Sequence, residues 1–165
     1  MSGRLSAPQP LAADHRTDGF SCGEASLDEW LRRRALVNQT TGASRTFVVT
    51  DDQGQVLAYY ALAAGAVSRQ EPPGSIRRNM PEPIPVMVLA RLAVDQRLQG
   101  RQVGGALLKD ALRRAAAVAQ NVGVRALLVH ALNEHARQFY IHYGFVASPV
   151  NPMTLMLALH TKGAH

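Results

Sequence analysis

The sequence predicts a mixed α/β fold, and two observations carry this prediction. First, two strand-like runs at Thr46–Thr50 and Val56–Val67 are separated by an Asp- and Gly-containing turn, which is typical of an antiparallel hairpin. Second, an apolar run at Val86–Val94, a helical pattern at Val103–Val118 and an apolar run at Val124–Leu132 follow one another. Strand, helix and strand in this order predict a crossover that makes the two strands parallel. We therefore expect a central mixed sheet with one parallel β–α–β crossover.

The N-terminal part is expected to lead into one helical region. Residues 1–20 mix polar and apolar residues, and Pro8 and Pro10 favour extended backbone. The segment Ser26-Leu27-Asp28-Glu29 is typical of a capping box and predicts that a helix begins there. Gly42 is expected to end this region, because glycine tolerates the left-handed backbone that closes many helices.

The C-terminal part continues the alternation of strands and helices. Residues 68–85 form a polar, Pro-rich excursion before the uniformly apolar run Val86–Val94, which we expect to be a central strand. Asn133 is placed to cap a helix that ends at Gly144, and Met153–Leu159 is the last expected strand. The helix between the two parallel strands has apolar residues at helical spacing: Val103, Leu107, Leu108, Ala111, Leu112 and Ala115.

Length and composition restrict the class of protein. A chain of 165 residues, 47% hydrophobic, predicts a single domain over residues 1–165, with residues 160–165 as a flexible tail. No apolar run approaches the roughly 20 residues that cross a bilayer, and the N-terminus lacks a hydrophobic signal core. We therefore expect a cytoplasmic protein without a membrane segment. The single Cys22 excludes an intramolecular disulfide, and the six histidines show no metal-ligand spacing.

The charge balance favours a polyanionic partner. The formal net charge is +6, the pI is about 10.2, and the excess is almost entirely arginine. Arginine offers a planar fork that binds phosphate through two hydrogen bonds. The clusters Arg32–Arg34 and Arg77-Arg78 exceed what one phosphorylated cofactor requires, although Arg32–Arg34 also fit a solvated basic helix face.

Residues 95–108 form a strand–turn–helix sequence suited to a phosphate. The turn carries Gly100, Gly104 and Gly105 and opens the helix, where free backbone N–H groups and the helix dipole favour an anion. Neither the dinucleotide pattern G-x-G-x-x-G nor the Lys-Ser/Thr ending of a P-loop is present. Taken alone, the turn fits a phosphate site and an ordinary loop before a core helix equally well.

Two segments together resemble the GNAT acetyltransferases. Gln99-Gly100-Arg101-Gln102-Val103-Gly104 resembles the family's acyl-CoA signature, Gln/Arg-x-x-Gly-x-Gly/Ala, with Gln102 where the family usually has glycine. If this position needs a positive φ, Gln102 is strained. If its backbone is helical, Gln102 is harmless and its N–H still points at the ligand. Asn133–Phe145 resembles the family segment Asn-x-x-Ala-x-x-Phe-Tyr-x-x-x-Gly-Phe, in order and at family spacing. The resemblance implies a GNAT fold in which strands 86–94 and 124–132 splay apart and hold acyl-CoA.

A narrower resemblance, over roughly residues 8–158, is to the TacT-like GNAT toxins of type II toxin–antitoxin systems. It implies transfer of acetyl from acetyl-CoA to the free α-amine of charged tRNA, which blocks translation. It also implies a ribbon-helix-helix antitoxin, operator DNA bound through the antitoxin complex, and a homodimer. The segments that carry it are Phe20–Leu31, Gly42–Val48, Arg77–Pro81, Pro83–Val86 and Ala90–Asp95.

The resemblance also implies the roles of individual residues. Tyr140 is the expected catalytic residue, placed to donate a proton to the leaving thiolate. The tRNA or the CoA phosphates are expected to contact Arg45, Arg77, Arg78 and Arg91, although Arg91, on an apolar strand, fits a structural ion pair almost as well. The expected cofactor-binding residues are Leu92, Ala93, Val94, Gln99, Gly100, Arg101, Gln102, Val103, Gly104, Gly105 and Asn133.

Two other functions compete with this one. A small-molecule N-acetyltransferase acting on a polyamine or aminoglycoside would favour an acidic cleft, and the sequence lacks acidic clusters apart from Asp51-Asp52 in a turn. A non-catalytic acyl-CoA-binding or DNA-associated module is the second alternative. The presence of Tyr140 and Asn133 argues against it.

Overall fold

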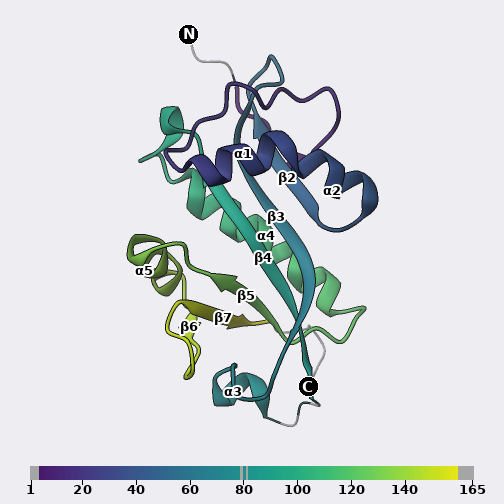
Figure 1. Cartoon of the computed structure of the whole chain (residues 1–165), viewed down its shortest axis with the longest axis vertical. Coiled ribbons are helices and arrows are strands. Elements are labelled where there is room, and N and C mark those ends of the chain that lie inside the picture. Colours follow the sequence, from purple (N-terminus) through teal and green to yellow (C-terminus); the bar gives the residue numbers. More distant parts are fainter. Residues whose placement is uncertain (1–3, 79, 81, 160–165) are drawn as a thin grey trace. The chain divides into compact units, whose positions relative to one another are not determined.

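The structure is a computed structural model that describes residues 4–78, 80 and 82–159. Seven strands form a mixed sheet in the order β1-β2-β3-β4-β5-β7-β6 (Figure 1). The chain divides into two compact units: the first unit is Met1–Ala63 with Arg91–Ala111, and the second unit is Ala64–Ala90 with Leu112–His165. The mixed α/β fold predicted from the sequence is confirmed. The expected tail at 160–165 and part of the Arg77–Pro81 segment lie outside the described residues.

The first unit contains the predicted hairpin. β2 pairs antiparallel with β3, and the short β1 pairs antiparallel with β2. The turn between β2 and β3 is held by Asp51, whose carboxylate accepts the backbone N–H groups of Gln53 and Gln55, and Gly54 has φ +78°. The elements that begin in this unit are β1 (Gln9–Pro10), α1 (Ala25–Arg33), α2 (Ala35–Thr41), β2 (Arg45–Thr50), β3 (Val56–Val67), η1 (Gln96–Leu98) and α4 (Val103–Ala119).

The predicted capping box at the start of α1 is wrong. The helix begins at Ala25 with Glu24 as its N-cap, and Glu24 makes no side-chain cap hydrogen bond. Asp28 is buried, and its carboxylate accepts the backbone N–H of Cys22 at 2.9 Å, which ties the helix to the preceding loop. The helical region is also divided at Arg34 into α1 and α2, and α2 ends at Gly42 (φ +84°) as predicted.

Two adjacent tyrosines of β3 show how helices cover the sheet in the first unit. Tyr59 packs in a core cluster with Phe20 and Leu31, on the side of α1 and α2. The hydroxyl of Tyr60 donates a hydrogen bond to the carboxylate of Asp110 on α4. Because successive strand residues point to opposite faces, α1 and α2 cover one face and the first half of α4 covers the other (Figure 1).

The second unit contains the predicted parallel pair. β4 and β5 are parallel, with Met87 opposite Leu127 and Leu89 opposite Val129, and β7 adds antiparallel to β5. β3 and α4 end in this unit and β4 passes from it into the first unit. The elements that begin here are α3 (Gly74–Arg77), β4 (Ile84–Val94), β5 (Ala126–His130), α5 (Glu134–His142), β6 (Val146–Ala147) and β7 (Thr154–Ala158).

Within the second unit, α3 was not predicted and α5 was. The sequence indicated a Pro-rich excursion over residues 68–85, but Ile76 is buried in the core cluster and anchors one helical turn there. At α5 the side-chain oxygen of Asn133 accepts the backbone N–H of Ala136 at 2.9 Å, which confirms the predicted cap. Gly144, with φ +96°, follows the end of this helix as predicted. None of the helices described is long and apolar enough to cross a membrane.

Candidate active site

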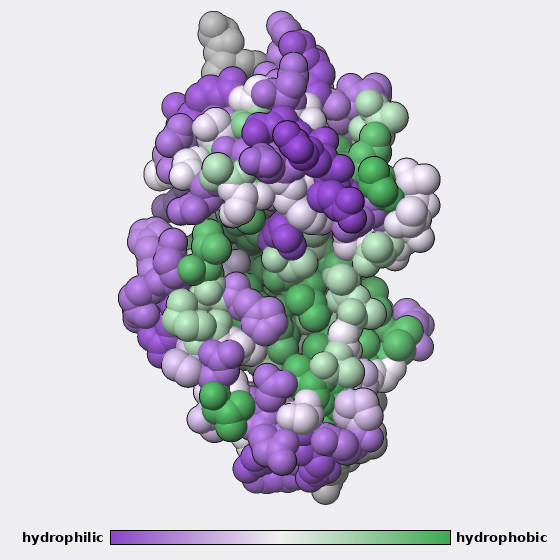
Figure 2. All heavy atoms as spheres, viewed as in Figure 1, coloured by the Kyte–Doolittle hydropathy of each residue, from purple (hydrophilic) through white to green (hydrophobic). Residues whose placement is uncertain are grey.

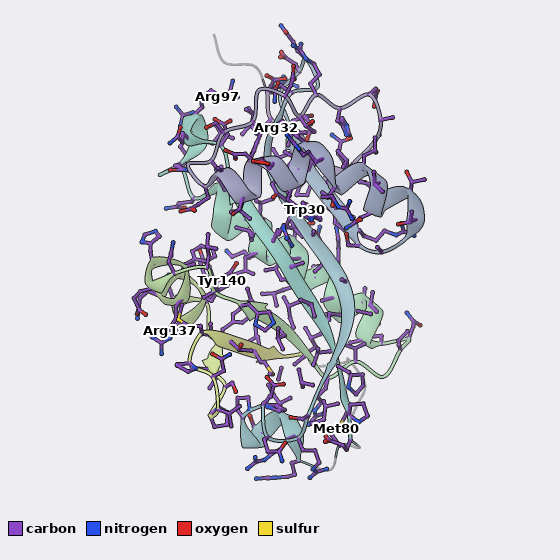
Figure 3. All side chains as sticks on the ribbon, viewed as in Figure 1. Trp30, Arg32, Met80, Arg97, Arg137 and Tyr140 are labelled. Atoms are coloured by element: carbon purple, nitrogen blue, oxygen red, sulfur yellow. The ribbon has the colours of Figure 1, made fainter. Side chains whose placement is uncertain are left out.

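The predicted site residues fall into two groups, one in each unit; Figure 3 labels Tyr140, which belongs to the second group. The first unit brings together the end of β4 at Leu92–Val94 and the turn Gln99–Gly105, and it also holds Arg45 and Arg91. The second unit holds Asn133, Tyr140, Arg77 and Arg78. Each group is built by its own local structure.

The turn before α4 has the geometry of an anion site. Gly100 has φ +82°, and a Cβ added there would meet no other atom within 4 Å, so the backbone surface is open. The hydrogen bond from Ala106 N–H to Gln102 O begins the helical ladder. The N–H groups of Val103, Gly104 and Gly105 therefore have no acceptor within the helix, and they lie at the positive end of its dipole. These residues fit the pyrophosphate of acyl-CoA.

Gln102 occupies the position where the GNAT signature usually has glycine. Its φ is +64°, in the left-handed region that a side chain other than glycine adopts at a cost of about 1 kcal/mol or more. The strained alternative considered from the sequence is therefore the one the chain adopts. The side chain is exposed, so the strain lies in the backbone and not in packing.

The side chain of Gln99 ties the turn to the segment before α1. Its amide donates to the carbonyl oxygens of Cys22 at 2.8 Å and of Val94 at 2.9 Å. Its two donors are thereby used inside the protein. We infer that Gln99 shapes the turn, and that any contact with the cofactor comes from the backbone.

Asp95 is a supporting residue that the sequence reasoning missed. Its carboxylate is buried and accepts the backbone N–H of Ser21 at 3.0 Å and two side-chain hydrogen bonds from Arg97, at 2.9 and 3.0 Å. Arg97 also donates to the carbonyl of Gly19. Burial favours the neutral acid, but the hydrogen bonds from Arg97 and Ser21 outweigh it and lower the pKa of Asp95. The signal in the sequence was an acidic residue directly after an apolar strand.

Cys22 lies beside this network and is half-buried. Burial is the main cause that raises the pKa of its thiol to about 11, so the thiol stays protonated near neutral pH. The sulfur donates weakly to the carbonyl of Glu24 at 3.6 Å.

Tyr140 lies in an apolar environment on α5. It is 6% exposed and packs edge-on against Phe139 and Phe145. Burial raises the pKa of its hydroxyl above the ordinary tyrosine value, so the group stays protonated at neutral pH. Among the residues that the structure describes, none forms a hydrogen bond with this hydroxyl, which leaves it available for a ligand.

Asn133 and the end of the parallel ladder are the other features of the second unit. The carbonyl oxygen of Asn133 caps α5, which leaves its exposed amide NH₂ able to donate. The ladder between β4 and β5 ends at Leu89 and Val129, although β4 continues to Val94. The residues of β4 beyond Leu89 therefore lie outside this ladder.

The candidate arginines have different environments. Arg45 donates to the carbonyl of Gln39 at 2.7 Å and so satisfies the end of α2. Arg77 at the end of α3 and Arg78 directly after it are exposed. The side chain of Arg125, which precedes β5, donates a hydrogen bond to the carbonyl of Ile76 in α3. α3 therefore lies near the N-terminal end of β5, whereas α5 follows the C-terminal end of that strand. Figure 2 shows hydrophilic side chains over both α1 and α3.

Arg91 is the arginine whose environment the sequence left open. Its guanidinium lies 4.6 Å from the ring centroid of Trp30, a cation–π contact. No carboxylate of the described part of the chain forms an ion pair with it, so the structural ion pair considered from the sequence is not found. The described residues also contain no group of three or more His, Cys, Asp or Glu side chains placed to hold a metal ion.

Comparison with known proteins identifies the family. Residues 42–147 match the acetyltransferase (GNAT) domain model. The chain is 50% identical over 159 residues to a tRNA-acetylating toxin of Mycobacterium tuberculosis, covering 96% of this chain and 95% of that protein. It is 29% identical over 157 residues to a probable toxin TacT of Sinorhizobium fredii, covering 89% and 87% of the two chains. The chain belongs to the GNAT family of acetyltransferases, as the two sequence segments predicted.

Solved structures of GNAT toxins match the same fold. AtaT complexed with acetyl-methionyl-tRNAfMet is 30% identical, covers 94% of this chain and 95% of its own, and has a TM-score of 0.87. AtaT bound to acetyl-CoA and to the C-terminus of its antitoxin AtaR is 28% identical over 94% of this chain and 93% of its own, with a TM-score of 0.80. The KacTA–DNA complex contains a chain 28% identical over 94% of both chains, with a TM-score of 0.79.

Proposed function

We propose that this protein is a toxin of the TacT-like class that transfers acetyl from acetyl-CoA to the free α-amine of aminoacyl-tRNA and so blocks translation. One observation carries the proposal: Tyr140 presents a protonated, unbonded hydroxyl in a chain that is 50% identical to a tRNA-acetylating toxin across nearly its whole length. The open turn before α4 supports the use of acetyl-CoA, which supplies the activated acetyl group as a thioester.

The cofactor is held mainly by backbone groups. The N–H groups of Val103–Gly105 and the open backbone at Gly100 would bind the pyrophosphate, with Gln99 and Asp95 keeping the turn in shape. Asn133 would donate its amide NH₂ to a pantetheine carbonyl. Backbone N–H groups of Leu92–Val94 would donate to the thioester carbonyl oxygen and stabilise the negative charge that develops on it.

The proton transfers need few side chains. The α-amine of an aminoacyl ester has a lower pKa than lysine, so a large fraction is neutral near pH 7 and can attack the thioester carbonyl directly. The amine proton can pass to water or to a backbone carbonyl. Tyr140, whose hydroxyl stays protonated at neutral pH, donates its proton to the departing sulfur.

The partners follow from the class of protein. The solved relatives include the toxin AtaT bound to the C-terminus of the antitoxin AtaR and an AtaT–AtaR complex bound to DNA. We propose that this chain likewise has a ribbon-helix-helix antitoxin, meets operator DNA through that complex, and acts in the cytoplasm as a homodimer. The net charge of +6 supports a tRNA substrate. Arg77, Arg78 and Arg91 are the candidates to contact it, whereas Arg45 is partly occupied by α2.

The test is an acceptor competition with the purified enzyme. Radiolabelled acetyl-CoA is supplied with bulk charged tRNA, with uncharged tRNA, and with a panel of polyamines and aminoglycosides. The proposal expects label in charged tRNA alone, released with the aminoacyl ester by mild base. Label in a polyamine or aminoglycoside with none in charged tRNA would favour the small-molecule acetyltransferase, and binding of acetyl-CoA without turnover would favour a non-catalytic module.

A further inference from the structure

An aromatic stack formed by one residue of α1 and one of β3 holds an arginine of β4 in a defined place. The rings of Trp30 and Tyr59 lie 12° from parallel, with centroids 5.9 Å apart, and the guanidinium of Arg91 lies 4.6 Å from the Trp30 centroid. Tyr59 is fully buried, and its hydroxyl donates to the carbonyl of Leu27 at 2.8 Å. The indole therefore rests on a rigid support. In Figure 3, Trp30 lies on the strand side of α1.

Arg91 shares a face of β4 with the core under α1. Ala93, two residues further on, packs in the same cluster as Leu31 and Tyr59, and alternate strand residues point to the same face. Unlike Ala93, Arg91 is partly exposed. Its guanidinium is thus supported by the protein and accessible to a ligand.

The hydrogen-bonding groups of Arg91 are not used within the described part of the chain. Its contact there is with the face of the indole, which leaves the N–H donors in the guanidinium plane free. Asp28 lies on the same helix as Trp30, but its carboxylate accepts the backbone N–H of Cys22 and does not pair with Arg91. A stacked guanidinium with free donors is suited to an oxyanion such as a phosphodiester, which it can bind through two hydrogen bonds.

The position of Arg91 connects this cation to the reaction. It directly precedes Leu92–Val94, the strand segment proposed to face the thioester carbonyl. In an aminoacyl-tRNA, the anion nearest to the reacting amine is the phosphodiester of the 3′-terminal nucleotide. Proteins recognise such single-stranded RNA ends with arginine and aromatic side chains.

We infer that Trp30 positions Arg91 to bind the phosphodiester of the 3′-terminal nucleotide of charged tRNA. The inference rests on the proposed function and names the part of the substrate that this site takes. Arg91 touches the substrate, and Trp30 is a positioning residue that acts through it. The competing anion is a phosphate of acetyl-CoA, which the experiment separates from tRNA.

The experiment compares Arg91→Ala and Arg91→Lys with Arg33→Ala, which removes an exposed arginine of α1. For each variant, kcat/KM is measured with bulk charged tRNA and with a mixture of amino acid methyl esters, and acetyl-CoA affinity is measured by calorimetry. Arg91→Ala is expected to lose about 10- to 100-fold in kcat/KM for charged tRNA and much less for the esters. The salt dependence of tRNA binding should weaken by a slope of about 1.

The other two variants isolate charge from geometry. Arg91→Lys keeps the charge but loses the planar fork, so it should retain the salt slope and still lose part of kcat/KM for charged tRNA. Arg33→Ala should stay within about twofold of wild type in kcat/KM, because the guanidinium of Arg33 is paired with the carboxylate of Glu29 at 3.9 Å.

A double-mutant cycle tests the role of Trp30. Trp30→Ala should lower kcat/KM for charged tRNA in the wild-type background and have little further effect in Arg91→Ala, since it acts through Arg91. Trp30→Phe should retain most activity, because a ring still supports the guanidinium. Equal losses from Trp30→Ala in both backgrounds would mean that the indole serves the core alone and would overturn its positioning role.

The outcomes separate the two levels of the proposal. If wild type does not acetylate charged tRNA, the proposed function fails and the inference fails with it. If wild type is active and Arg91→Ala keeps its kcat/KM and salt slope, the inference alone fails. If the loss in Arg91→Ala is matched by an equal loss of acetyl-CoA affinity, Arg91 belongs to the cofactor and the inference is overturned.

Discussion

At the scale of single residues, Tyr140 and Gln102 each depart from ordinary behaviour for a physical reason. Tyr140 is buried among aromatic rings, which keeps its hydroxyl protonated, and no described residue uses that hydroxyl. Gln102 adopts a left-handed backbone at the start of the helix that is proposed to bind the cofactor. Three predictions follow from these two residues.

Tyr140→Phe should fold normally and bind acetyl-CoA with unchanged affinity while losing about 10²- to 10⁴-fold in kcat. The ring contacts with Phe139 and Phe145 remain, and the proton donor alone is removed. Steady-state acetylation of charged tRNA and calorimetric binding of acetyl-CoA check both parts. Wild-type turnover in this variant would remove Tyr140 from the mechanism.

The value of kcat/KM should rise with pH and then level off. Loss of the Tyr140 proton should not lower it again at alkaline pH. Activity needs a neutral amine and a protonated tyrosine. The amine gains reactivity as pH rises through its own pKa, below the roughly 7.7–8.0 of an ordinary α-amine. The raised pKa of Tyr140 means that its proton is lost only at pH values above its ordinary value of about 10. Initial rates are measured between pH 6 and 9, in assays short enough to avoid hydrolysis of the aminoacyl ester. A fall in kcat/KM below pH 9 would contradict the prediction.

Gln102→Gly should stabilise the protein by about 1 kcal/mol, because glycine adopts a positive φ without steric cost. Gln102→Ala is the matched control, since alanine keeps the strain and should leave stability nearly unchanged. Urea denaturation of the three proteins measures the difference. Equal stability of the glycine and alanine variants would show that the backbone here is not strained.

At the scale of elements, the turn after β4 depends on the loop before α1. Asp95, Gln96 and Gln99 hydrogen-bond to residues 21 and 22, and Arg97 reaches Gly19. The turn that is proposed to bind acetyl-CoA is therefore held by a segment more than 70 residues earlier in the chain. Disturbing that link should affect cofactor binding and stability together.

Asp95→Asn should destabilise the protein by about 1–3 kcal/mol at pH 7, because a buried carboxylate that accepts several hydrogen bonds is lost. The pKa of Asp95 is lowered by folding, so its contribution is present above the unfolded value of about 3.9 and is lost as pH falls through the folded value. Urea denaturation of both proteins from pH 7 down to pH 3 should show the difference shrinking below about pH 4. A difference independent of pH would mean that the charge of Asp95 contributes nothing.

At the scale of the whole molecule, the formal net charge of +6 comes mostly from arginine. Within the second unit, Arg77 and Arg78 lie near the N-terminal end of β5, whereas α5 follows its C-terminal end. We expect this pair to serve tRNA and not acetyl-CoA.

Replacing both Arg77 and Arg78 by alanine should weaken charged-tRNA binding and reduce its salt slope by about 1.5, while acetyl-CoA affinity barely changes. The double lysine variant keeps the charge and should keep the slope. Filter binding at increasing salt measures both. An unchanged slope in the alanine variant would assign the electrostatic contacts to other arginines.

Parts of the fold that depend on neighbours in the chain could be predicted from the sequence. The hairpin, the parallel crossover, the cap at Asn133 and the helix ends at Gly42 and Gly144 all follow from local residue types and periodicity, and the structure agrees with each. The family signature could also be identified from the sequence, because each of its two segments is continuous in the chain.

Other features could not be predicted, because they depend on contacts between residues that are distant in sequence. Asp28 accepts the backbone N–H of Cys22 in place of the predicted capping box, and Ile76 of α3 packs in a core cluster of the second unit. The bond between Ser21 and Asp95 spans 74 residues, and no local pattern encodes such a pairing. The same holds for Arg91, whose place on Trp30 becomes visible only when β4 and α1 are packed together, since a single sequence does not state which side chains will meet.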